Sequence, residues 1–142
     1  MDTSGERFVP DAGMGRDIEI EHLHRYEALA KNLSGKVVLD AACGVGYGSF
    51  ILGRYAKKVI GVDIDKEAIE YAKKHYSNDK ILFYEMSIVE MNFPDCYFDA
   101  VISFETIEHV PEDVQNKFLK DIARVLKPDG FLAISTPDLD TF

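Results

Sequence analysis

The stretch that decides the fold is Val37-Val38-Leu39-Asp40-Ala41-Ala42-Cys43-Gly44-Val45-Gly46-Tyr47-Gly48-Ser49. It begins as an apolar run that ends in an acid, which is typical of a strand buried on both faces of a sheet. A glycine-dense turn follows, and an apolar, helix-like pattern begins at Ser49. A strand, a turn free of Cβ atoms and a helix N-terminus favour binding of a polar or anionic ligand group. We therefore expect a ligand cradle here.

Length and composition limit the class of protein. A chain of 142 residues is long enough for one domain with its own core. Sixteen basic residues against 25 acidic ones leave a net charge of −9, which argues against nucleic acid as a partner. Two cysteines in the whole chain indicate a reduced, cytoplasmic setting rather than a disulfide framework. The sequence shows no signal peptide and no apolar run long enough to cross a membrane.

Strand-like and helix-like patterns alternate along the chain. The expected strands are residues 36–41, 59–63, 81–84, 98–103 and 131–135. The expected helices are residues 17–34, 49–55, 65–75 and a segment opened by Pro111, whose apolar stripe is Val114, Phe118, Leu119, Ile122, Val125 and Leu126. Residues 127–130 have the composition of a turn. This alternation predicts an α/β fold, doubly wound, with a mostly parallel five-stranded sheet in the order 3-2-1-4-5 and helices on both faces.

Polar residues follow three of these strands. In doubly wound folds, ligands bind beyond the carboxyl ends of the strands, where Asp40, Asp63 and the segment 103–105 are expected. A carboxylate at the position of Asp63 can accept both hydroxyls of a ribose. The glycine turn alone does not complete the dinucleotide pattern G-x-G-x-x-G, because residue 49 is Ser. A ribose-bearing ligand is therefore expected, and both NAD and an adenosyl compound qualify.

Four motifs in order resemble those of class I S-adenosylmethionine-dependent methyltransferases, which have a Rossmann-like fold. They are Val38-Leu39-Asp40-Ala41-Ala42-Cys43-Gly44-Val45-Gly46, Gly61-Val62-Asp63-Ile64-Asp65, Phe98-Asp99-Ala100-Val101-Ile102-Ser103 through Glu108-His109-Val110, and Leu126-Lys127-Pro128-Asp129-Gly130-Phe131-Leu132. They span residues 36–136, and together they are specific.

The resemblance implies a binding site for S-adenosylmethionine. Residues implied to surround its methionine portion are Asp40, Ala41, Ala42, Gly44 and Gly46, with main-chain atoms of Ser103 and Phe104. Asp63 would bind the ribose, and Ile64 would pack on the adenine. Ser87, followed by Ile88, stands where the family often has an Asp near the adenine amine, so a hydroxyl would replace the carboxylate. Ala42 stands where Gly is commoner.

The resemblance also places Glu105 and His109 on the acceptor side. In-line methyl transfer depends mainly on positioning. A base is needed only where the acceptor must lose a proton, and these two residues are the candidates for it. The alternative for His109 is a purely structural hydrogen bond to a neighbouring loop. No metal site is expected.

The chain divides into an N-terminal arm, residues 1–16, and a cofactor-binding domain, residues 17–142. Arg7 in the arm could pair with the methionine carboxylate if the arm closes as a lid. The family usually continues past the fifth strand with a helix and two more strands, whereas this chain stops at Phe142. Either the chain is a fragment, which we favour, or it is a minimal domain whose exposed fifth-strand edge is protected, for example in a homodimer formed through that edge or through the lid.

The leading hypothesis is thus a methyltransferase that uses S-adenosylmethionine on a small-molecule acceptor of unknown identity. The second hypothesis is a module that binds the cofactor and turns over little or not at all. The third is an NAD-dependent oxidoreductase, against which the incomplete glycine pattern and the turn before the fifth strand both count.

Overall fold

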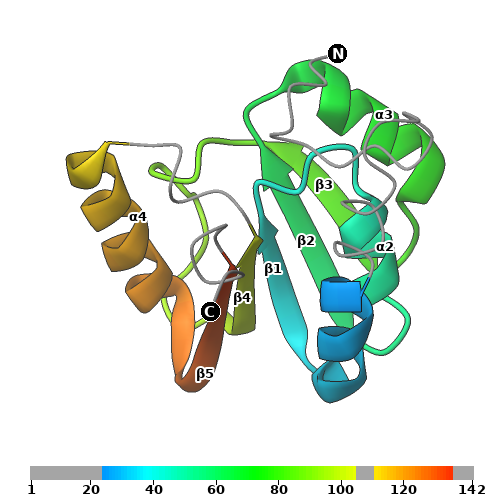
Figure 1. The fold of residues 1–142 in the computed structure, drawn as a ribbon, viewed down its shortest axis with the longest axis horizontal. Helices are drawn as coiled ribbons and strands as arrows, with labels where there is room; N and C mark the ends of the chain where they lie inside the picture. Colours follow the sequence, from blue (N-terminus) through cyan, green and yellow to red (C-terminus); the bar gives the residue numbers. More distant parts are fainter. Residues whose placement is uncertain (1–23, 105–110, 136–142) are drawn as a thin grey trace.

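The computed structural model describes residues 24–104 and 111–135. Residues 24–30 are helical and continue into the 3-10 helix η1 (Lys31–Leu33). The strands are β1 (Val37–Ala41), β2 (Lys58–Asp63), β3 (Ile81–Glu85), β4 (Phe98–Phe104) and β5 (Leu126–Ser135). The helices between them are α2 (Tyr47–Leu52), α3 (Lys66–Tyr76) and α4 (Glu112–Val125), as Figure 1 shows.

The five strands form one parallel sheet in the order β3-β2-β1-β4-β5, which confirms the expected fold class and strand order. β1 is central: its Asp40 lies opposite Gly61 of β2 and Ile102 of β4. The chain moves outward from β1 in one direction to β3, and then returns to place β4 on the other side of β1. The carboxyl ends of β1 and β4 therefore flank the topological switch point, where doubly wound folds bind ligands.

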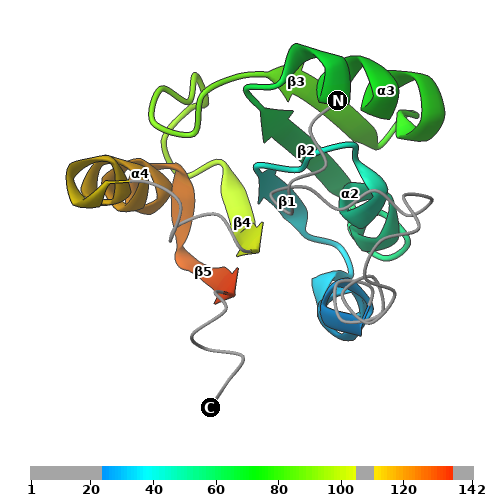
Figure 2. The ribbon, with the colours of Figure 1, turned by 45° about the horizontal axis from the view of Figure 1, so that its top comes forward.

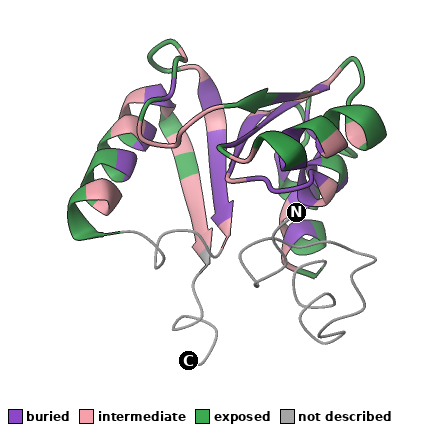
Figure 3. Cartoon of the chain, turned by 90° about the horizontal axis from the view of Figure 1, so that it is seen from above, coloured by how far each residue is buried: buried purple, intermediate pink, exposed green. Residues whose placement is uncertain are grey.

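Alternate residues of the strands pack into two separate cores, one on each face of the sheet. On β1, Val38 joins the core that includes residues of α2 and α3, whereas Leu39 joins the core that includes residues of α4. Figure 2 shows α4 on one side of the sheet and α2 and α3 on the other. Buried residues concentrate in the central strands (Figure 3), which fits the continuous apolar runs that predicted them.

The helix after the glycine turn is shorter than expected. It begins at Tyr47 rather than Ser49 and ends at Leu52 rather than near Tyr55. After Leu52, the N–H of Arg54 donates to the carbonyl of Ile51 and that of Tyr55 to Leu52. Such bonds between residues three apart tighten the chain into a turn and end the α-helix.

The expected turn at residues 127–130 lies inside strand β5. Phe98 pairs with Leu126 and Ala100 with Phe131, so β5 accommodates extra residues opposite Asp99 as an irregular bulge. Lys127 holds this bulge through its Nζ, 3.2 Å from the Oδ1 of Asp99. The turn predicted at residues 127–130 is therefore wrong: these residues form a bulge within β5, which begins five residues before the expected start.

The amphipathic helix α4 is confirmed, with two corrections to its stripe. Phe118, Ile122 and Val125 are buried against the sheet, whereas Leu119 is 39% exposed. Leu126 belongs to β5 rather than to the helix.

Asp65 caps α3 as expected, because its Oδ1 accepts the N–H of Ala68 at 3.1 Å. Within the described residues, no helix has both the length and the hydropathy needed to span a membrane. In the same part of the chain, no group of three or more His, Cys, Asp or Glu side chains is placed to hold a metal ion.

Candidate functional site

The turn after β1 is built from residues with positive φ. The φ angles of Ala42, Gly44 and Gly46 are 62°, 58° and 94°. Only glycine adopts this region without strain, so Ala42 is a strained position. The departure at Ala42 that stood out in the sequence therefore falls where the backbone asks for glycine. A Cβ on Gly46 would lie 2.7 Å from the Cβ of Ala72, so this glycine also allows α3 to approach closely.

Asp63 connects the end of β2 to this turn. Its Oδ2 accepts the backbone N–H of Gly44 at 2.9 Å, and its Oδ1 accepts the N–H of Asp65 at 2.9 Å. A carboxylate has about four acceptor sites, so both oxygens keep capacity for further donors. The structure therefore brings together two residues that the sequence placed 19 positions apart, and leaves Asp63 able to accept ribose hydroxyls.

Asp40 lies beneath the turn and is fully buried. Its Oδ2 accepts the hydroxyl of Ser49 at 2.7 Å, and its Oδ1 accepts that of Tyr26 at 3.4 Å. Burial raises the pKa of the Asp40 carboxyl to about 7, although both hydrogen bonds lower it, and the charge of Asp63 raises it further. Asp40 thus changes charge near neutral pH and holds the start of α2 through Ser49.

Tyr26 packs across the turn from the N-terminal helical segment. A Cβ on Gly48 would lie 2.2 Å from the Cζ of its ring, so the ring occupies the space that the glycine leaves. The ring also meets Phe104 edge to face, with centroids 4.9 Å apart. Tyr26 therefore contacts the glycine turn, the end of β4 and Asp40.

Ser103 contributes a buried oxygen at the switch point. It follows Ile102, which pairs with Asp40 of β1. Its Oγ is buried and, among the described residues, has no hydrogen-bond partner. An unpartnered buried hydroxyl is costly, and a polar ligand group would relieve that cost. The sequence predicted only main-chain contacts here.

The side expected to meet adenine begins where β3 ends. The N–H of Met86 donates to the carbonyl of Asp63 at 3.0 Å, so the segment after β3 starts beside the ribose-binding candidate. Ser87 is half-buried, and its Oγ accepts the N–H of Val89 at 3.2 Å. Ile88 packs against the α4 side of the core. Ile64 is 71% exposed, an apolar surface beside this segment.

Ala41 closes β1, and its side chain is buried in the core that includes residues of α4. Cys43 is also buried. Burial raises the pKa of its thiol, as do the charges of Asp40 and Asp63, so the thiol stays protonated and is not a nucleophile. Glu105 and His109, the candidates for the acceptor side, and Arg7 lie outside the described residues.

The chain resembles a known protein family over most of its length. The family described as "Methyltransferase domain" matches residues 39–134, which run from β1 into β5. The chain belongs to the methyltransferase domain family. S-adenosylmethionine is the cofactor of this family's class, as the motifs predicted. The glycine turn, the open acceptor sites of Asp63 and the unpartnered oxygen of Ser103 fit its polar groups.

Curated relatives support the same family. A protein of Mycobacterium tuberculosis (strain CDC 1551 / Oshkosh) named "Probable S-adenosylmethionine-dependent methyltransferase" is 34% identical over 139 residues, covering 98% of this chain and 49% of the relative. The ubiquinone biosynthesis O-methyltransferase of Haemophilus ducreyi is 36% identical over 114 residues, covering 75% of this chain and 48% of that protein. The chain thus spans about half the length of these relatives.

A solved structure also matches. The PH0226 protein from Pyrococcus horikoshii OT3 has a TM-score of 0.71 and 32% identity, covering 85% of this chain and 59% of that one.

Sequence patterns do not indicate two of the polar side chains that organise this part of the protein. Ser49 donates to Asp40, and its spacing of nine residues from Asp40 carries no local signal. Arg124 lies beside the apolar stripe of α4 and binds the segment after β3. Its pairing with Asp121 three residues earlier was the available clue.

Proposed function

We propose that this chain is the S-adenosylmethionine-binding part of a methyltransferase that acts on a small-molecule acceptor. The observation that carries the proposal is the contact of Asp63 with Gly44, which joins the ribose-binding candidate to the glycine turn. The 36% identity to a protein named as a ubiquinone biosynthesis O-methyltransferase supports a small-molecule acceptor.

Residues of the strand ends would hold the cofactor. Asp63 would accept the ribose hydroxyls with the acceptor sites that Gly44 and Asp65 leave open. Ile64 would cover one face of the adenine, and its 71% exposure supports this role. Ser87 and Ile88 would line the far side of the base.

The methionine end would lie over the turn. Backbone atoms from Ala41 to Gly46, with Ser103 and Phe104, would line it, and Asp40 would place a negative charge below it once ionised. Asp40 would act in part through other groups, since it is buried and each of its oxygens already accepts one hydroxyl, from Ser49 or Tyr26. Bound S-adenosylmethionine supplies an activated methyl group on its sulfonium.

The acceptor would lie beyond β4, where Glu105 and His109 are the candidates to receive a proton. Because methyl transfer relies first on in-line positioning, a base matters only for acceptors that must ionise. We propose these two residues for that role.

A second proposal is a cofactor-binding unit that does not complete the reaction alone. It is supported by the coverage of about half of each curated relative. Transfer of a labelled methyl group from S-adenosylmethionine to phenols, amines, thiols and carboxylates separates the two. If the amount of labelled product falls in Glu105→Gln or His109→Ala but not in the control Glu70→Gln, whose side chain is exposed, the chain is an active methyltransferase. Binding without transfer to any class supports the second proposal, and failure to bind contradicts both.

We also propose a cytoplasmic location. The two free cysteines support a reducing setting.

We further propose a homodimer whose subunits meet at an outer strand of the sheet. β3 and β5 are the outer strands in the described part of the chain, and outer strands offer pairing groups to a partner. Sedimentation equilibrium tests the dimer, and a monomer at all concentrations would contradict it.

A further inference from the structure

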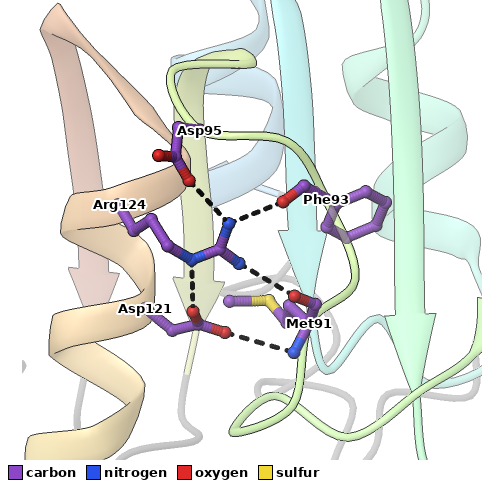
Figure 4. Close-up of polar contacts among 5 residues, drawn as sticks. All are labelled: Met91, Phe93, Asp95, Asp121 and Arg124. Carbon is purple, nitrogen blue, oxygen red and sulfur yellow. Dashed lines mark hydrogen bonds and ion pairs between the residues drawn. The ribbon is translucent and has the colours of Figure 1, made fainter.

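The segment between β3 and β4, residues 86–97, is held against α4 at two places. Near its end, the N–H groups of Cys96 and Tyr97 donate to the carbonyls of Arg124 and Val125, and in its middle the guanidinium group of Arg124 binds it. Figure 4 shows Arg124 reaching from α4 to this segment, with Asp121 one helical turn earlier. The segment has no helix or strand of its own, and backbone hydrogen bonds fix its two ends, so the Arg124 contacts and apolar packing position its middle part around Met91.

Arg124 uses every nitrogen of its fork. Nη1 donates to the carbonyl of Phe93 at 2.6 Å and lies 3.0 Å from Oδ1 of Asp95, while Nη2 donates to the carbonyl of Met91 at 2.9 Å. Nε donates to Oδ1 of Asp121 at 2.9 Å, and Oδ2 of Asp121 accepts the N–H of Met91 at 3.1 Å. Met91 is thereby held through both its N–H and its carbonyl. Charge-assisted, forked contacts of this kind fix geometry as well as position.

The contacts differ in how far they are shielded from water. The side chain of Asp95 is 76% exposed and that of Asp121 is 19% exposed. An exposed ion pair contributes little. The carbonyls of Met91 and Phe93 and the carboxylate of Asp121 therefore do most of the holding.

The other end of the same segment reaches the cofactor side of the sheet. It leaves β3 beside Asp63, and Ser87 and Ile88 come first. Met91, three residues after Ile88, is buried in the α4 side of the core. The N–H of Glu90, the residue before Met91, donates to the carbonyl of Ser87 at 3.2 Å, so this turn links the position of Met91 to that of Ser87 and Ile88.

We infer that Arg124 is a positioning residue for the adenine end of the cofactor site, acting through Asp121 and the backbone of Met91 and Phe93 on Ser87 and Ile88. This inference rests on the proposed function. Arg124 does not touch the cofactor in this assignment.

Arg124→Lys keeps the charge and removes the fork. The matched controls are Asp95→Asn, which removes only the exposed pair, and Lys127→Gln, which removes the neighbouring pair with Asp99 and contacts no part of the segment. The probes are S-adenosylhomocysteine and adenosine, titrated calorimetrically against the full chain. Adenosine lacks the amino-acid half, so it isolates the adenosine end.

Arg124→Lys should raise the Kd of both probes by the same factor, about 10- to 100-fold for the loss of one charged hydrogen bond. Both controls should stay within about twofold of the wild type. Hydrogen exchange at the amide of Met91 should be faster in Arg124→Lys than in the wild type and unchanged in the two controls. Faster exchange at Met91, with slow exchange kept in the central strands, shows that the segment is released while the chain stays folded.

Unchanged affinity in Arg124→Lys despite faster exchange at Met91 would overturn the inference and leave the proposed function intact. A larger loss for S-adenosylhomocysteine than for adenosine would also overturn it, because the effect would then extend beyond the adenine end. Wild-type protein that binds neither probe would contradict the proposed function and the inference with it.

Discussion

The Oδ2 of Asp63 lies 2.9 Å from the backbone nitrogen of Gly44 and accepts its hydrogen bond. This contact ties the carboxyl end of β2 to the turn that follows β1. The ribose-binding candidate and the glycine turn are thus joined directly by a hydrogen bond. Preorganisation of this kind lowers the ordering cost of binding.

Asp40→Asn should remove a pH dependence of stability. Between 3.8 and about 7, folded protein keeps a proton on Asp40 that the unfolded chain has lost, so its contribution to stability falls as pH rises through this window and is level above it. One pKa unit corresponds to about 1.4 kcal/mol. From pH 5 to 8, the free energy of unfolding of Asp40→Asn should therefore gain about 3 kcal/mol relative to wild type. Urea titrations at both values measure this, and a constant difference would contradict a raised pKa.

Ser49→Ala tests the same carboxyl from the donor side. Ser49 donates at 2.7 Å to a group that is neutral at pH 5 and charged at pH 8. A hydrogen bond to a charged group contributes about 1.5–3 kcal/mol, against about 0.5–1.5 kcal/mol for a neutral one. The variant should lose more stability at pH 8 than at pH 5. Equal losses at the two pH values would show that Asp40 does not ionise in this range.

Gly46→Ala and Gly35→Ala form a matched pair. Both glycines have positive φ, 94° and 74°, but a Cβ on Gly46 meets the Cβ of Ala72 at 2.7 Å, whereas one on Gly35 meets nothing within 4 Å. Gly35→Ala should cost about 1 kcal/mol from backbone strain, and Gly46→Ala about 2–5 kcal/mol because overpacking adds to it. Chemical unfolding measures both. Similar losses would mean that α3 does not press on the turn as described.

Ala42→Gly should stabilise the protein. Ala42 has a φ of 62°, and relief of that strain outweighs the added chain entropy by about 0.5–1 kcal/mol. The control is Ala123→Gly on the exposed face of α4, which should lose about 1 kcal/mol. Thermal unfolding ranks the two, and a loss at Ala42 equal to that at Ala123 would contradict the strained turn.

The sequence predicted the elements that depend on local pattern. Apolar runs predicted the strands, and the acidic residues at the ends of two of them predicted that Asp40 and Asp63 lie at the carboxyl ends of neighbouring strands, as observed. What it could not supply depends on contacts between distant segments. The donation of Ser49 to Asp40 and the contacts of Arg124 with residues 91–95 join parts of the chain that no periodicity connects.

Local patterns also failed where pairing overrides turn chemistry. Residues 127–130 read as a turn because of Pro128 and Gly130, but β4 extends its pairing past them and turns them into a bulge in β5. The start of β5 is determined by its pairing with β4, and the composition of residues 127–130 carries no information about that pairing.

The central claim is that the strand ends around Asp63 bind S-adenosylmethionine. Asp63→Asn removes the charge and turns an amide toward Gly44 or Asp65, both of which donate. Exposed Asp79→Asn makes the same charge change away from the site. The decisive measurement is calorimetric titration of S-adenosylhomocysteine, with NAD as the competing ligand. The wild type and Asp79→Asn should bind S-adenosylhomocysteine with equal affinity and should not bind NAD. In Asp63→Asn, the Kd for S-adenosylhomocysteine should rise roughly 10- to 100-fold. Binding of NAD alone, or equal affinity in Asp63→Asn, would contradict the claim.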